Sequence, residues 1–284
     1  MYIILGATGH VGSVVAKKLL ASGKPVTIVT RDRGKEKEWQ QQGAKVAVAD
    51  VLDTKRLSAI FRNGERLFLL NPPADPSGDT VKEEEAGIHA ILDALLDSPI
   101  QQVVAESTYG AQAGERIGDL GILYEMEIGL QSSGKAHRVI RGAYYMSNWD
   151  SALVTAREEG VVHTLYPTEF KLPMVAPSDL GNFAAQLLME PIGTGEIFFA
   201  EGPARYSSDD VAAGFAKLLR KPVKAISTPK TQWAASLKKQ GFSEQAAQSM
   251  VKMTELTLAQ EDKNPKDPHR GVTTLENYIA GLLS

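Results

Sequence analysis

The residues nearest the start of the chain carry the clearest chemical signal. Gly6-Ala7-Thr8-Gly9-His10-Val11-Gly12 follows a short apolar run and opens an amphipathic segment. This spacing permits a tight turn at Gly6, close approach of the backbone to a pyrophosphate at Gly9, and close helix–strand packing at Gly12. Free N–H groups and the helix dipole at a helix start attract phosphate. The loop therefore predicts a dinucleotide site formed by the whole run. An ordinary glycine turn is the alternative.

The residue after the second predicted strand, 26–30, bears on the choice of cofactor. Arg31 stands there, followed by Asp32. An arginine at this position accommodates the 2′-phosphate of NADP, whereas an acid binds the ribose hydroxyls of NAD. Arg31 favours NADP(H), and Asp32 keeps NAD(H) open. The alternative is a solvated charge run that opens a surface helix.

Further candidate cofactor residues stand at the ends of later predicted strands, where open parallel sheets bind ligands. The Asp50 carboxylate, at the end of the third strand, could accept from an adenine amino group. A hydroxyl at Ser107 could orient a carbonyl. Plain strand-ending turns are the alternative, and the neighbouring acid Glu106 has no role that the sequence explains. The full predicted set at these strand ends is Asp50, Val51, Asn71, Pro72, Pro73 and Ser107.

The elements that must position these residues alternate between short apolar runs and longer amphipathic ones. This pattern predicts an α/β fold: a Rossmann-like, doubly wound parallel sheet with a smaller C-terminal substrate lobe. We expect a dinucleotide-binding unit over 1–148 and a lobe over 149–284 packed on it, with a polar and mobile tail over 261–270. The predicted strands are 2–5, 26–30, 46–49, 67–70, 103–105, 138–141 and 197–200. The predicted helices are 11–21, 35–42, 54–61, 81–96, 122–131, 180–189, 209–219, 232–240 and 244–259.

Composition excludes several other classes of protein. The chain has 284 residues, 43% of them hydrophobic, and a formal net charge of −3, so disorder and direct nucleic-acid binding are not expected. It has no cysteine, which excludes disulfides, thiolate zinc sites and cysteine nucleophiles. Its histidines show no metal-ligand spacing, so no metal is expected. No apolar run approaches the ~20 residues of a membrane helix, so we expect no membrane association and a cytoplasmic location.

With these motifs the chain resembles the NmrA-like family, an atypical branch of the short-chain dehydrogenase/reductase superfamily. The resemblance covers nearly the whole length. It implies either an NADPH-dependent reductase of quinones or similar flat acceptors, or a non-catalytic NADP(H) sensor that acts through a protein partner. The segments that carry it are Gly6 to Gly12, Val29 to Asp32, Ala49 to Val51, Phe68 to Pro73, Glu127 with Ser133-Gly134, Arg141 to Asn148, Val175 to Leu180, and Glu201 to Pro203.

Most short-chain dehydrogenases use a Tyr-x-x-x-Lys pair, in which the lysine lowers the tyrosine pKa. None of the eight tyrosines here has a lysine four places on. The resemblance places Glu127 at the lysine position and Leu123 at the tyrosine position. Tyr124 and Glu127 are thus the only catalytic candidates on this helix. A packing role for Tyr124 is the favoured alternative, and Glu127 could orient the nicotinamide ribose.

An aromatic cluster after the last strand of the first unit could form a wall for a flat substrate. Its predicted substrate residues are Tyr144, Tyr145, Met146 and Asn148. Packing of this segment on the C-terminal half is the alternative. The partners we expect are a small-molecule substrate or a regulatory protein, with a homodimer also open.

Overall fold

The computed structural model describes residues 1–193, 195–259 and 265–282. Its centre is an eight-stranded sheet whose strand pairs are all parallel. Apolar runs form these strands because helices cover both faces of the sheet. Across the sheet the order is β13 (His269–Arg270), β10 (Glu196–Glu201), β6 (His137–Gly142), β5 (Gln102–Thr108), β4 (Arg66–Leu69), β1 (Tyr2–Ile4), β2 (Val26–Thr30) and β3 (Lys45–Val48).

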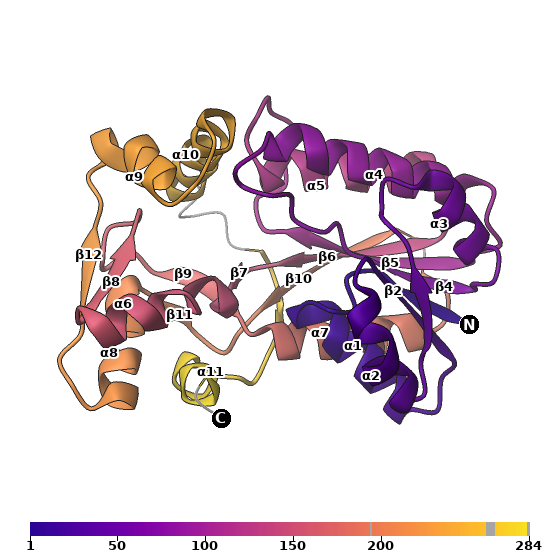
Figure 1. The fold of residues 1–284 in the computed structure, drawn as a ribbon, viewed down its shortest axis with the longest axis horizontal. Coiled ribbons are helices and arrows are strands. Elements are labelled where there is room, and N and C mark those ends of the chain that lie inside the picture. The colour runs from indigo at the N-terminus through magenta and orange to yellow at the C-terminus, as the bar shows by residue number, and fades with distance from the viewer. Residues whose placement is uncertain (194, 260–264, 283–284) are drawn as a thin grey trace.

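Helices lie on both faces of this sheet (Figure 1), which confirms the predicted doubly wound fold. One face carries α1 (His10–Ala21), α2 (Glu36–Gln41) and α7 (Pro177–Met189). The other carries α3 (Thr54–Phe61), α4 (Thr80–Leu96) and α5 (Asp119–Ser132). The strand order reverses between β1 and β4, and in folds of this kind ligands bind in the crevice at that point.

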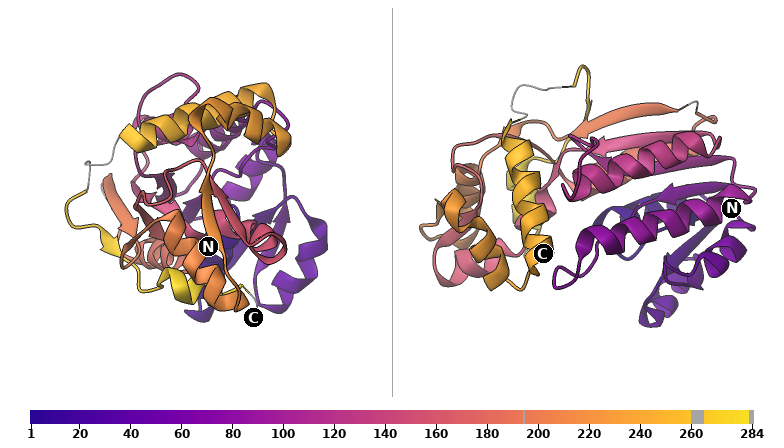
Figure 2. Two further views of the ribbon diagram at one scale, coloured as in Figure 1. Left: turned by 90° about the vertical axis from the view of Figure 1, so that its left-hand side faces the viewer. Right: turned by 90° about the horizontal axis from the view of Figure 1, so that it is seen from above.

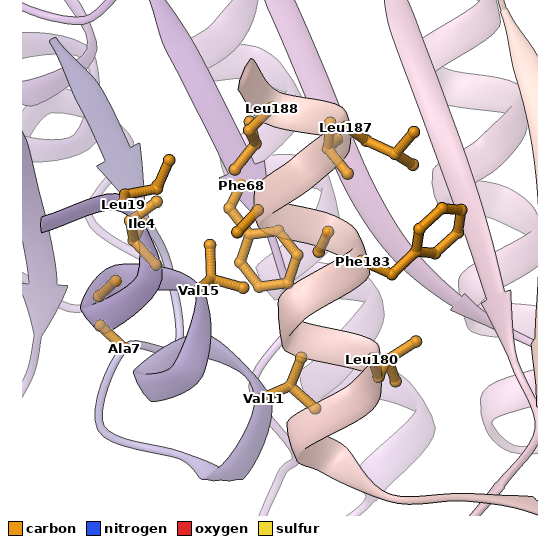
Figure 3. Packing of buried hydrophobic residues seen from close by; sticks show 14 of the residues in the cluster. Ile4, Ala7, Val11, Val15, Leu19, Phe68, Leu180, Phe183, Leu187 and Leu188 are labelled. Carbon is orange, nitrogen blue, oxygen red and sulfur yellow. The ribbon is translucent and has the colours of Figure 1, made fainter. Parts of the chain in front are cut away.

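Helix α7 ties the second half of the chain to the first, because it packs directly on α1 (Figure 3). Val11 and Val15 of α1 and Leu180 of α7 belong to one buried cluster with Phe68 of β4. The helices approach closely at Gly181, where a Cβ would lie 2.7 Å from Val14 Cβ. Residues after 148 also add β10 and β13 to the sheet, so the two predicted units share one sheet.

The remaining elements form a lobe at the end of the sheet (Figure 2). Its core includes Met146, Met174, Val211 and Phe215. Its strands are β7 (Tyr144–Tyr145), β9 (Leu172–Val175) and β11 (Arg205–Tyr206) in one sheet, and β8 (Val161–Thr164) and β12 (Lys224–Ser227) in another. Its helices are α6 (Ala152–Glu158), α8 (Ser208–Leu219), α9 (Trp233–Lys239), α10 (Glu244–Ala259) and α11 (Leu275–Gly281), with 3-10 turns at Met146–Trp149 and Lys230–Gln232.

Several bounds differ from the sequence prediction. The predicted helix 35–42 divides into a 3-10 turn, Arg33–Lys35, and α2. The predicted tail 261–270 lies partly outside the described residues, and its end is not a free tail, because His269 and Arg270 pair with β10. The short elements β8, β9, β12, α6 and α11 were not predicted. Within the described ranges, no helix has the length and apolar character needed to cross a bilayer.

Candidate dinucleotide and substrate site

The glycine loop has the geometry that its spacing predicts. Gly6 adopts φ +65°, a conformation that side chains disfavour. A Cβ at Gly12 would lie 2.3 Å from the Gly6 carbonyl oxygen, so only glycine lets α1 pack so closely. At Gly9 a Cβ would meet only that same oxygen, at 3.4 Å, which leaves open space beside the loop. Thr8, Gly9 and His10 are exposed, while Ala7 and Val11 are buried beneath them.

The start of α1 leaves its N–H groups open to an anion. Gly9 is the N-cap and has no side chain to accept from them, and the first turn contains no acidic residue. The helix dipole then favours a negative charge at this position. A phosphate group therefore fits the loop, because the glycines leave room for it and the free N–H groups can bind it.

Within the described residues, Asp32 is hydrogen-bonded to neighbouring backbone and side-chain atoms, whereas Arg31 is not. Asp32 Oδ1 accepts from the Gly34 N–H at 2.7 Å, and the Asp32 N–H donates to Thr30 Oγ1 at 3.0 Å, so Asp32 caps the following turn. Arg31 is exposed at the end of β2 and has no hydrogen-bond or ion-pair partner among the described residues. The guanidinium is thus the freer of the two groups, which favours a 2′-phosphate over ribose hydroxyls.

The other predicted cofactor residues follow the ends of β3 and β4. Asp50 is exposed, and its Oδ1 accepts from the Leu52 N–H at 2.9 Å while Val51 is half-buried beside it. Asn71 Nδ2 donates to the Glu84 carbonyl at 3.3 Å, and Asn71 Oδ1 is buried with no partner among the described residues. Pro72 is half-buried and Pro73 exposed. The β1 and β4 ends meet, because a Cβ at Gly6 would lie 2.8 Å from Leu70 Cδ2.

A cavity of about 450 Å³ lies beyond β4 and β5. Three of the predicted substrate residues line it, Tyr144, Tyr145 and Asn148, and so do the predicted cofactor residues Asn71, Pro73 and Ser107. The rest of the wall is aromatic, apolar and acidic, with two basic residues. These other members are Leu70, Glu84, Glu106, Thr108, Tyr109, Gly110, Asp119, Leu120, Leu123, Ala143, Tyr166, Phe170, Lys171, Leu172, Pro173, Phe199, Arg205, Met253 and Thr257.

The C-terminal lobe closes the far side of this cavity. Helix α10 supplies Met253 and Thr257 to the wall. It is held against the loop after β4, because the Ser243 N–H donates to the Pro76 carbonyl at 2.9 Å and Ser243 Oγ to the Gly78 carbonyl at 2.6 Å. Tyr166 and Phe170 stack at 5.8 Å between ring centroids and form another part of the wall. A flat aromatic molecule fits such surroundings.

Ser107, Glu127 and Arg141 form one buried polar cluster beside the cavity. Arg141 makes a bidentate ion pair with the Glu127 carboxylate. Nε donates to Oε1 at 2.9 Å, and Nη2 donates to Oε2 at 2.6 Å. Ser107 Oγ also donates to Glu127 Oε1, at 2.5 Å. Glu127 is therefore fully engaged by protein groups, and it is absent from the cavity wall. Its position favours a structural ion pair over a contact to the nicotinamide ribose.

Two other candidates lie away from the cavity. Leu123 lines it, whereas the adjacent Tyr124 does not and makes no hydrogen bond to a described residue. The rotation of about 100° between successive helical residues turns Tyr124 off that face. Met146 has no exposed surface and packs in the core of the C-terminal lobe, so it does not reach a substrate.

Glu106 was the unexplained acid of the sequence, and the structure places it in the cavity wall. Only 4% of its surface is exposed. Tyr145 Oη donates to Glu106 Oε1 at 3.0 Å, whereas Oε2 is buried without a partner among the described residues. Burial raises the pKa of Glu106 well above its ordinary value, and burial likewise raises the pKa of Tyr145.

A second acidic pair, Glu84 and Asp119, lies elsewhere on the same wall. The two carboxyls hydrogen-bond to each other, and Glu84 Oε1 also accepts from the Ala74 N–H at 2.9 Å. Burial, reinforced by the Asp119 charge, raises the pKa of Glu84 to about 7. Asp119 keeps accessible surface, yet its dense surroundings desolvate it and raise its pKa as well.

Sequence reasoning missed most of this acidic and aromatic wall. Glu84 and Met253 lie within predicted helices and Asp119 and Phe170 outside them, and none of the four was assigned a role at a site from the sequence. One signal was present: Glu106 directly follows the apolar run Val103-Val104-Ala105 inside a buried strand. Acidic residues are rarely buried, and those that are buried are often found at functional sites.

Comparisons with known proteins agree with this fold. The model of the NmrA-like family matches residues 2–279. The NAD(P)H azoreductase of Xenophilus azovorans is 23% identical over 283 residues, which cover 100% of this chain and 90% of the relative. The NADPH-dependent quinone oxidoreductase of Escherichia coli, solved with NADPH, has a TM-score of 0.82 at 21% identity and full coverage of both chains. The Citrobacter triphenylmethane reductase, solved with NADP(H), has a TM-score of 0.82 at 16% identity and 99% coverage of both chains.

Proposed function

The chain belongs to the NmrA-like family, and we propose that it is an NADPH-dependent reductase of quinones or similarly flat acceptors. One observation carries the proposal. The open glycine loop after β1 and the aromatic cavity beyond β4 and β5 lie at the same edge of the sheet, on either side of Leu70. A dinucleotide that spans this edge would reach from the loop to the cavity.

The cofactor side of the site uses residues that the fold leaves open. The run Gly6 to Gly12 would hold the pyrophosphate, and Arg31 the 2′-phosphate. Asp50 and Val51 would lie beside the adenine, and Asn71, Pro72 and Pro73 beside the nicotinamide half. Bound there, NADPH supplies a hydride. The relatives named above bind NADPH, NADP(H) or NAD(P)H by their own descriptions, which supports the same choice here.

The acceptor side is an aromatic slot. Tyr144, Tyr166 and Phe170 line it, and Tyr144 meets Tyr166 edge-on at 6.2 Å between ring centroids. Asn148 adds an exposed amide to the wall. The named relatives include an azoreductase and a quinone oxidoreductase. Their acceptors are flat and conjugated, as this slot requires.

The machinery of alcohol dehydrogenation is missing. The Tyr-x-x-x-Lys pair is absent from the sequence, and Glu127 is bound to Arg141. A carboxylate cannot lower a tyrosine pKa, because its negative charge disfavours the phenolate. Reduction of an electron-poor acceptor does not need this base, because the reduced acceptor takes up a proton.

The decisive experiment measures NADPH oxidation with a panel of quinones, azo compounds and simple aldehydes, alongside calorimetric binding of NADPH and NADP. We expect turnover with the conjugated acceptors and little or none with the aldehydes. Tight binding of both dinucleotides without any turnover would instead indicate a sensor that acts through a protein partner. Absence of dinucleotide binding would overturn both functions.

A further inference from the structure

We propose that Glu106 is the acid that delivers a proton to the acceptor, in place of the tyrosine that the chain lacks. This inference rests on the proposed reductase function. It assigns a role to a cavity residue that lies outside the Tyr-x-x-x-Lys scheme of the superfamily.

The position of Glu106 separates it from the ion pair beside it. Glu106 and Ser107 are consecutive residues of β5, so their side chains point to opposite faces of the sheet. Ser107 points toward α5, where it binds Glu127, which also binds Arg141 of β6. Glu106 points toward α7, where a Cβ at Gly142 would approach both it and Leu180. No cation contacts Glu106 among the described residues.

The space around Glu106 is shaped to hold it. A Cβ at Gly142 of β6 would lie 2.8 Å from Glu106 Oε1 and 3.2 Å from the Tyr145 ring. Any larger residue there would displace the carboxyl from the phenol. The glycine therefore keeps the Glu106–Tyr145 pair together at the end of the cavity formed by β5 and β7.

The hydrogen bonding of Glu106 leaves one of its two oxygens without a partner among the described residues. Tyr145 Oη donates to Oε1, and Oε2 is buried and unpartnered. Asp119 of α5 lies near enough to Tyr145 for its charge to raise the pKa of that phenol further, and Leu180 of α7 lies beside Gly142 next to the pair. Burial, with no neighbouring cation among the described residues, raises the pKa of Glu106 and so favours its neutral, protonated form. A neutral carboxyl has one O–H, and Oε2 is the oxygen that can carry it.

The second acidic pair is less suited to this role. Glu84 and Asp119 bind each other, and the Ala74 N–H occupies Glu84 Oε1. A proton shared between two carboxyls is retained by both of them. The Glu106 proton has no such competing acceptor among the described residues.

The step balances as a two-electron reduction. The acceptor takes a hydride with its electron pair from NADPH, which leaves NADP⁺, and negative charge develops on an acceptor oxygen or nitrogen. The Oε2–H bond of Glu106 breaks as the new O–H or N–H bond forms. Glu106 is left as a carboxylate, and water restores its proton after product release.

The test is Glu106→Gln, which keeps an oxygen for Tyr145 and removes only the acid. An infrared spectrum at pH 7 should show a protonated-carboxyl band in the wild type that the variant loses. With acceptors whose reduced oxygen is strongly basic, kcat should fall by about 100-fold or more, the range of a general acid. The loss should shrink as the reduced acceptor becomes less basic, and NADPH affinity should stay unchanged.

Glu125→Gln is the matched control, because Glu125 is exposed on α5. It should change neither the band nor the rate. An unchanged band or an unchanged kcat in Glu106→Gln overturns the role of Glu106 while leaving the reductase in place. A wild type that turns over no acceptor overturns both. If Glu106→Gln fails to fold, Glu106→Asp replaces it in the test, because this variant keeps a carboxylic acid. It should keep the infrared band, and with acceptors whose reduced oxygen is strongly basic its kcat should fall, by less than about 100-fold. An unchanged kcat in Glu106→Asp counts against the role of Glu106.

Discussion

Ser107 Oγ donates a 2.5 Å hydrogen bond to Glu127 Oε1, which joins the end of β5 to α5. These are the positions of the catalytic serine and lysine in the superfamily that the sequence resembles. Here the two side chains bind each other and Arg141. The residues at these two positions thus form a structural cluster with Arg141, and the proposed reductase takes its proton from another residue of the cavity.

This ion pair should stabilise the fold. Glu127→Gln leaves the Arg141 charge buried beside a neutral amide, and breaking a buried pair from one side costs about 3–5 kcal/mol. We expect urea denaturation to show a loss of about 3 kcal/mol in the free energy of unfolding. Glu276→Gln, which breaks the exposed pair with Lys217, should cost less than about 1 kcal/mol. Equal losses would mean that burial adds nothing to the Glu127 pair.

Tyr124 should be dispensable, because it does not line the cavity. Reductase activity of Tyr124→Phe should remain within about tenfold of the wild type, measured as kcat with a quinone acceptor. A general acid contributes ~100- to 10,000-fold. A loss in that range would restore Tyr124 as the acid and would also remove the need for Glu106.

Replacing Gly9 of the glycine loop should abolish NADPH binding and leave the protein folded. Gly9→Val fills the open space beside the loop, so NADPH binding should disappear from calorimetry while the melting temperature holds. Gly12→Ala provides the contrast, because its Cβ would lie 2.3 Å from the Gly6 oxygen and should lower the melting temperature. NADPH bound by Gly9→Val with normal affinity would show that the pyrophosphate lies elsewhere.

Arg31 should select the phosphorylated cofactor. A charge-assisted hydrogen bond contributes on the order of 1.5–3 kcal/mol, so Arg31→Ala should weaken NADPH by roughly ten- to a hundredfold. NADH should be little affected, and Lys37→Ala, at an exposed position on α2, should change neither. Calorimetry with both cofactors measures this. Equal losses for NADPH and NADH would mean that Arg31 supports the loop rather than the choice of cofactor.

The acidic pair should make stability depend on pH. With its pKa raised to about 7, Glu84 in the folded protein retains a proton that the unfolded chain, with a pKa near 4.5, has already released. The free energy of unfolding should therefore fall as the pH rises between these two values. Glu84→Gln should flatten that slope in urea titrations, and Glu158→Gln, on the exposed end of α6, should not. Identical slopes in all three proteins would contradict the shift.

The local parts of this fold could be predicted from the sequence, because their signals are local. The glycine spacing fixes the turn at Gly6 and the packing at Gly12, and apolar runs give each strand of the first half. The short elements of the lobe escaped prediction for the same reason. β9 contains Pro173, and β12 begins with the exposed Lys224, so neither has a strand pattern of its own.

The candidate site was harder to predict from the sequence, because the side chains that contact one another there come from distant segments of the chain. The sequence places Glu127 within a predicted helix, but only the fold brings Arg141 of β6 to it. Met146 belongs to an aromatic run that reads as one surface, yet the 3-10 turn buries it while Asn148 stays exposed. Which side of a short turn meets a cavity depends on tertiary packing.

The cavity draws its two walls from parts of the chain that lie far apart in sequence. The wall from β4 and β5 adjoins the cofactor loop, and the opposite wall comes from Tyr166, Phe170 and α10. A randomised library confined to 166–171 and 250–257 would therefore sample new acceptors while the nucleotide pocket stayed intact. The wall formed by Tyr166, Phe170 and α10 can thus change in sequence while the strand ends that adjoin the glycine loop stay the same.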